Sequence, residues 1–118
     1  MTQSSNGELY AVADFCLIPI GTGTPSIALH IAECQRVLEK SGLTYKLHGY
    51  GTNIEKEGSW SAVSQAIHDC HAAVHALGAL KIATNVRIGT RTDKEVVPGT
   101  GNEIKVQRVV DILAQDSK

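Results

Sequence analysis

The chain has 118 residues, the usual size of one domain, so it can form one hydrophobic core but not two. Its 11 basic and 12 acidic residues give no electrostatic footprint for nucleic acid or an anionic membrane, and no apolar stretch is long enough to span a membrane. The 3 cysteines are scattered and form no C-x-x-C pair, which favours a reducing compartment, so we expect a cytoplasmic protein.

The N-terminal part of the chain predicts a short tail followed by a buried strand. Residues 1–8 are polar, and we expect them to be a flexible segment ahead of a single domain, residues 9–118. The mostly apolar run LYAVADFCLIPIG then begins at Leu9 and stops at Pro19 and Gly21, which is how a largely buried strand ends.

A helix is predicted after the loop GTGTPS. Thr24 suits the N-cap, Pro25 suits the first helical position, and Gly42 ends the pattern. The backbone N–H groups of this loop, with the hydroxyls of Thr22 and Thr24, suit an anion site at the helix N-terminus; an ordinary capping turn explains the loop equally well. The apolar face of the helix holds Ile27, Ile31, Cys34 and Leu38.

The middle of the chain predicts two strands and a second helix. The segments TYKLHGYG and TNIEKEG alternate as strands do and meet at Gly51, which indicates a tight hairpin. The stretch SWSAVSQAIHDCHAAVHALG, residues 59–78, predicts a helix with a serine before its start and Gly78 just past its end. Its helical apolar positions are Val63, Ile67, Cys70, Val74 and Leu77.

The last strand is predicted over residues 81–93, and the glycine-rich loop VVPGTGNE leads from it to a C-terminal helix. That helix is amphipathic, and its apolar positions are Ile104, Val109, Val110 and Leu113. The order of elements therefore predicts an α+β fold of the ferredoxin-like βαββαβ type, with a four-stranded antiparallel sheet and an added C-terminal helix.

In this fold both main helices cover one face of the sheet, so the other face, here called the open face, carries the polar side chains. Alternation puts Arg87, Arg91 and Asp93 on the open face, opposite Ile82, Thr84, Val86 and Ile88. In the second strand it places Lys46, His48 and Tyr50 there, and Tyr45 and Leu47 toward the helices. The sequence leaves the faces of Asp14 and Glu55 open.

Catalytic and metal sites are not supported. The sequence lacks a nucleophile elbow and an H-E-x-x-H motif, and nothing indicates that Asp14 and Glu55 meet as an acid–base pair. Three histidines of the second helix recur at helical spacing, which we interpret as structural or interface positions rather than metal ligands. They are His68, His71 and His75.

Four segments together resemble the small thiamine-binding protein family, long catalogued as uncharacterised: ADFCLIPIGTGTPSI, HGYGTNIE, CHAAVHALG and RIGTRTDK. The resemblance extends from Tyr10 to Leu113. It implies a ferredoxin-like subunit, a homo-oligomer that is a tetramer built from dimers, and binding of thiamine or its hydroxymethylpyrimidine part without catalysis. It implies no cofactor other than this ligand, and it leaves open whether the ligand is phosphorylated.

The resemblance also implies a set of ligand-binding positions. An aminopyrimidine needs acceptors, donors and a flat apolar wall. Arginine forks at the end of the last strand suit a phosphorylated ligand or orient acidic groups. The expected ligand-binding residues are Thr22, His48, Thr52, Glu55, Arg87, Thr90, Arg91 and Asp93.

This sequence departs from the family pattern after the hairpin. The stretch IEKEGSW inserts two residues before the glycine, so either Glu55 or Glu57 takes the place of the family's hairpin glutamate. Ser61 stands where an acidic residue is common. Two alternative functions remain: an interaction protein whose polar sheet face forms the oligomer, and a metal-assisted enzyme that uses the histidines of the second helix.

Overall fold

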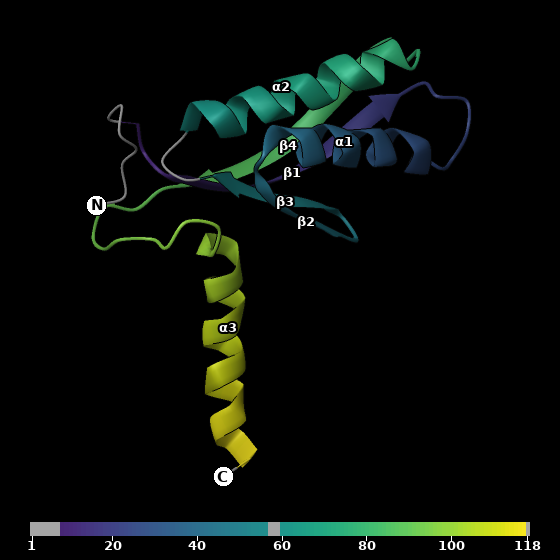
Figure 1. Ribbon diagram of the computed structural model, residues 1–118. Helices are drawn as coiled ribbons and strands as arrows, with labels where there is room; N and C mark the ends of the chain where they lie inside the picture. Colours follow the sequence, from purple (N-terminus) through teal and green to yellow (C-terminus); the bar gives the residue numbers. More distant parts are fainter. Residues whose placement is uncertain (1–7, 57–59, 118) are drawn as a thin grey trace.

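The structure is a computed structural model that describes residues 8–56 and 60–117 (Figure 1). Its order of elements confirms the predicted ferredoxin-like pattern with an added C-terminal helix. The elements are β1 (Ala11–Ile20), α1 (Ala28–Ser41), β2 (Thr44–His48), β3 (Gly51–Lys56), α2 (Trp60–Ala76), β4 (Lys81–Gly89), α3 (Gly101–Ala114) and the 3₁₀ turn η1 (Gln115–Ser117).

The sheet has the strand order β2-β3-β1-β4, and every neighbouring pair is antiparallel. Helices α1 and α2 cover one face, while α3 points away from the other (Figure 1). Alternate residues of β1 enter the core beneath α1 and α2, because successive side chains of a strand point to opposite faces. The core residues are Ala11, Ala13, Phe15, Leu17, Cys34, Leu38, Leu43, Ile54, Val63, Ala66, Cys70 and Val74.

The strand register resolves the faces that the sequence left open. Asp14 pairs with Arg87 across β1 and β4, between core residues of β1, so both side chains lie on the open face. Ile54 is fully buried in the core, which turns its neighbour Glu55 to the open face. The predicted alternation of β4 is therefore confirmed up to its end at Gly89.

In the hairpin, two of the side chains lie on the faces that alternation predicts. Tyr45 packs against the core, and His48 reaches Asp14 on the open face. Tyr50, however, lies in the turn between β2 and β3 and not on a strand, and its side chain is 90% exposed. The prediction that places it on the open face is wrong, because β2 ends at His48.

Two predicted boundaries are wrong for identifiable reasons. Helix α1 begins at Ala28 and not at Pro25, because the hydroxyl of Thr24 donates to the Ser26 carbonyl within the loop instead of capping a helix. Strand β4 stops at Gly89 and not at residue 93, because the pairing of β1 with β4 begins at Val12, and Val12 lies opposite Gly89. Alternation therefore says nothing about Arg91 and Asp93.

The two helix ends at Gly42 and Gly78 are confirmed, and both glycines have positive φ, at 78° and 108°. Leu77, predicted as the last apolar position of the second helix, lies just after α2 and is 52% exposed. Of the predicted N-terminal tail only Glu8 is described; its carboxylate accepts hydrogen bonds from the backbone N–H and hydroxyl of Ser61, at the start of α2. Glu57 and Ser59 lie outside the described residues.

The C-terminal helix forms as predicted, but its apolar side chains stay uncovered. Residues Ile104, Val109, Val110 and Leu113 are all about half exposed. The projecting α3 also explains a radius of gyration of 16.1 Å, since a compact chain of this length has about 13.5 Å.

Candidate functional site

A buried carboxylate on the open face holds the start of α3. The side chain of Glu55 is 1% exposed and accepts hydrogen bonds from the hydroxyl of Tyr10 at 2.6 Å and from the backbone N–H groups of Gly101 at 2.7 Å and Asn102 at 2.9 Å. These backbone donors belong to the first turn of α3, which has no partners of its own for them. Glu55 therefore caps the helix and places a negative charge at its positive end.

The glycine-rich loop is shaped by this contact. Gly99 has a φ of +81°, and its N–H donates to the hydroxyl of Tyr10 at 2.9 Å. A Cβ atom on Gly101 would lie 2.6 Å from the side chain of Val12 and 2.9 Å from the carboxylate of Glu55. The helix approaches the sheet so closely here that any larger residue forces the side chain of Val12 or Glu55 to shift.

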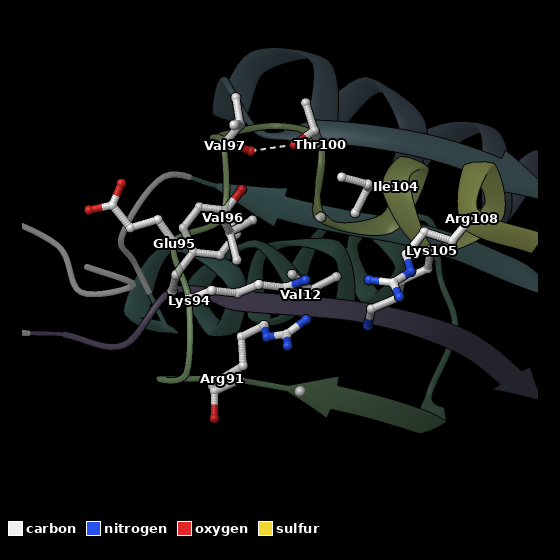
Figure 2. A pocket seen from close by; sticks show the side chains of 14 residues that line it. Val12, Arg91, Lys94, Glu95, Val96, Val97, Thr100, Ile104, Lys105 and Arg108 are labelled. Carbon is white, nitrogen blue, oxygen red and sulfur yellow. Dashed lines mark hydrogen bonds between the residues drawn. The ribbon is translucent and has the colours of Figure 1, made fainter. Parts of the chain in front are cut away.

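Beside this anchor lies a cavity of about 180 Å³, here called the cationic cavity. Its apolar part includes Val12 and Ile104, and four basic side chains reach it from different segments. Figure 2 shows the nitrogen atoms of Arg91, Lys94, Lys105 and Arg108 gathered on the same side, while the carboxylate of Glu95 points away from them. The full lining is Tyr10, Val12, Gly89, Thr90, Arg91, Lys94, Glu95, Val96, Val97, Thr100, Gly101, Ile104, Lys105 and Arg108.

The local sequence explains why these groups meet. Gly101, Ile104, Lys105 and Arg108 are spaced by three, four and seven residues from the start of α3, so they share one helical face. Arg91 lies just beyond the end of β4 and forms a bidentate ion pair with Asp93: its Nε donates to Oδ1 at 2.6 Å and its Nη2 to Oδ2 at 2.5 Å. The guanidinium of Arg91 lowers the pKa of Asp93 to about 2.

A second cavity, of about 300 Å³ and here called the hairpin cavity, lies between α1, β1 and the β2–β3 turn. The side-chain amide of Gln35 donates to the Thr52 hydroxyl at 3.2 Å, and Thr52 is 3% exposed. The carbonyl oxygen of the same amide is buried and has no hydrogen-bond partner among the described residues. The lining is Phe15, Cys16, Leu17, Ile27, Ile31, Cys34, Gln35, Leu47, His48, Gly49, Tyr50, Gly51 and Thr52.

The open face carries an ion pair between strands. Arg87 donates to both oxygens of Asp14, at 2.9 and 2.8 Å, and His48 lies 3.6 Å from the same carboxylate. The hydrogen bond from Arg87 lowers the pKa of Asp14 from its ordinary value. Arg87 is thus turned to an acidic neighbour in this structure and lines neither cavity.

The histidines of α2 make separate local contacts. His71 hydrogen-bonds the hydroxyl of Thr84 at 2.6 Å, and His75 hydrogen-bonds the carbonyl of Ala79 at 2.7 Å. Burial lowers the pKa of His71, which favours its neutral form. Within residues 8–56 and 60–117, no three histidine, cysteine, aspartate or glutamate side chains form a group that could hold a metal ion.

The predicted ligand-binding residues are divided among several places. Thr90 and Arg91 line the cationic cavity, with Glu55 behind it and Asp93 paired to Arg91. His48 and Thr52 line the hairpin cavity. Thr22 lies in the exposed loop before α1, where its hydroxyl donates to the Thr24 carbonyl.

Sequence reasoning missed Gln35 and three of the four cations at the cationic cavity. The spacing of Lys105 and Arg108 was a usable signal, since both fall on the face of the last helix that begins at Gly101. Gln35 gave no signal, because a single polar residue beside the apolar stripe of α1 is common.

The architecture is that of a ferredoxin-like α+β protein with a projecting C-terminal helix. The family model described as "Thiamine-binding protein" matches residues 13–110, and the chain belongs to this family. The description names binding and no reaction. No helix in the described part of the chain combines the length and apolar character needed to cross a bilayer.

Relatives extend the match across several organisms. A UPF0045 protein of Synechocystis is 48% identical over 70% of this chain and 66% of its own length. The UPF0045 protein YqgV of Bacillus subtilis is 40% identical over 84% of this chain and 93% of its own length.

Solved structures agree on the fold. A hypothetical protein of Methanocaldococcus jannascii matches with a TM-score of 0.71 and 23% identity, over 85% of this chain and 95% of its own. A putative thiamine biosynthesis/salvage protein of Thermotoga maritima matches with a TM-score of 0.61 and 10% identity, over 80% of this chain and 98% of its own.

Proposed function

We propose that the protein is a carrier or sensor that binds thiamine or its hydroxymethylpyrimidine part in the hairpin cavity, without catalysing a reaction. The family supports the class of ligand. The observation that carries the proposal is the buried, unpartnered carbonyl oxygen of Gln35 in a mostly apolar cavity. A buried acceptor without a partner costs free energy, and a ligand donor removes that cost.

The chemistry of the cavity suits an aminopyrimidine. Phe15, Leu17 and Ile31 supply apolar walls for a flat ring, and the exocyclic amino group of the ligand donates to the Gln35 carbonyl. The described lining includes no lysine or arginine, so a thiazolium cation meets no fixed positive charge there. A volume of about 300 Å³ lies at the lower end of the range for small-molecule sites.

Isothermal titration calorimetry with thiamine and with hydroxymethylpyrimidine tests this proposal. We expect saturable binding that is about tenfold weaker in Gln35→Met, because the side chain keeps its size but loses the acceptor, together with the hydrogen bond that its amide donates to Thr52. Gln107→Met on α3 is the matched control, since Gln107 is exposed and lines neither cavity. The proposal fails if folded protein gives no saturable heat with either ligand, or if Gln35→Met binds as tightly as the original protein.

We also propose that the protein works as a homo-oligomer, a tetramer built from dimers, in the cytoplasm. The uncovered apolar side chains of α3 support an assembly in which a second copy covers this helix, because half-exposed valine, leucine and isoleucine in one contiguous row are typical of interfaces. The row holds Val106, Val109, Val110 and Leu113, which are three, four and seven residues apart; Ile112 is also exposed on this helix. Three free cysteines, Cys16, Cys34 and Cys70, agree with a reducing compartment.

A further inference from the structure

We infer that the cationic cavity binds a phosphate group, either as inorganic phosphate or as the phosphoryl end of a small phosphomonoester. This site is separate from the hairpin cavity, with which it shares no lining residue. The inference stands independently of the ligand proposed for the hairpin cavity.

Charge convergence is the first argument. Four basic groups from the end of β4, the following loop and α3 line a cavity of about 180 Å³, and their nitrogen atoms gather on one side of it (Figure 2). In the part of the chain that the structure describes, Lys94, Lys105 and Arg108 make no ion pair with a carboxylate. Arg91 is paired with Asp93, so Lys94, Lys105 and Arg108 bring the uncompensated positive charge to this cavity, and a multivalent anion is attracted to it.

The second argument is that the positions of these cations are built into the fold. Lys105 and Arg108 lie on the helix that Glu55 caps, so their distance from β1 is set by the close contact at Gly101. Arg91 is oriented by its two-bond contact with Asp93. Anion sites gain affinity when the binding groups are held in place before the ligand arrives.

The third argument concerns which anion fits. Glu55 already occupies the N-terminus of α3, so side chains and not the helix end must hold the ligand. Guanidinium and ammonium groups from several segments of the chain suit the oxygens of a phosphate group. The cavity of about 180 Å³ accommodates a phosphate group, and the apolar side chains of Val12, Val96 and Ile104 provide contact for a short organic group of a phosphomonoester.

The experiment measures binding of inorganic phosphate and of thiamine phosphate by calorimetry at constant ionic strength, set with chloride. The test protein carries Lys105→Gln and Arg108→Gln, which keep the helical face but remove two charges. The control carries Arg36→Gln with Lys40→Gln on α1, away from both cavities. We expect affinity for phosphate to fall at least tenfold in the test variant and to stay within twofold in the control.

The two ligands distinguish the source of the phosphate group. Binding of inorganic phosphate supports a site for the free ion, and tighter binding of thiamine phosphate that survives Gln35→Met supports a phosphomonoester in this cavity. The inference is overturned if neither inorganic phosphate nor thiamine phosphate binds in the chloride buffer. It is also overturned if the control variant loses as much affinity for phosphate as the test variant. Because Gln35 lines only the hairpin cavity, loss of thiamine binding in Gln35→Met leaves this result unaffected.

Discussion

The side chain of Glu55 links three segments of the protein on the open face. Its carboxylate joins β3 to Tyr10 and to the first turn of α3, and it is almost fully buried. A buried acceptor with three donors is stabilising only while every partner remains in place. The identity of the residue is therefore constrained by structure, whatever ligand the neighbouring cavity holds.

Replacing Glu55 by glutamine tests this role. The amide of Glu55→Gln has one acceptor oxygen, so its NH₂ group faces a backbone donor, and the charge at the helix end is lost. We expect the free energy of unfolding to fall by about 1–3 kcal/mol, measured by urea denaturation. Glu103→Gln, an exposed position in the first turn of α3, serves as the control. Equal effects of the two substitutions would show that the buried hydrogen bonds contribute nothing.

Gly101 sets the position of a whole element, because it lets α3 meet β1 and β3 at close range. Alanine favours a helix by up to about 1 kcal/mol over glycine, but here its Cβ would overlap Val12 and Glu55. We expect the clash to dominate and Gly101→Ala to destabilise the protein by about 1–3 kcal/mol, with weaker phosphate binding as α3 is displaced.

Gly49→Ala is the matched control for this prediction. No atom lies within 4 Å of the Cβ position at Gly49, and its φ is not positive. Thermal unfolding of both variants measures the difference. A Gly101→Ala protein as stable as Gly49→Ala would show that the contact relaxes at no cost.

The elements were predictable because the pattern of apolar residues fits each structure: a mostly apolar run along β1, a period of two along β4, and a spacing of three to four along α1 and α2. Their ends depend on partners that lie far away in sequence. The end of β4 is set by where β1 stops pairing with it, opposite Val12, and the start of α1 by hydroxyl groups that bond within the loop. For the same reason the cationic cavity was only partly predictable, since Lys105 and Arg108 reach it through a contact between Glu55 and Gly101.

At the scale of the whole molecule, the uncovered face of α3 predicts how copies associate. We expect the original protein to be oligomeric in light scattering after size-exclusion chromatography, and Val109→Lys with Leu113→Lys to shift it toward a smaller assembly. These residues are 55% and 59% exposed and lie one helical turn apart, so lysines there place charge in an apolar interface.

The control for this prediction carries Leu29→Lys with Leu80→Lys, two exposed leucines outside α3. It should retain the assembly. If Arg87→Ala dissociates the assembly and the double lysine variant of α3 does not, the interface lies on the open sheet face instead. A monomeric original protein would contradict the proposed oligomer altogether.

The attachment of α3 through its first turn also makes this helix a lever. Its 14 residues extend about 21 Å from the contact at Glu55. A rotation of about 10° at the base therefore moves the far end by about 4 Å, which is comparable to the spacing between packed side chains. The basic residues near the base and the apolar row toward the tip lie on the same helix. A small rotation of α3 at its base therefore moves the apolar row by a larger distance.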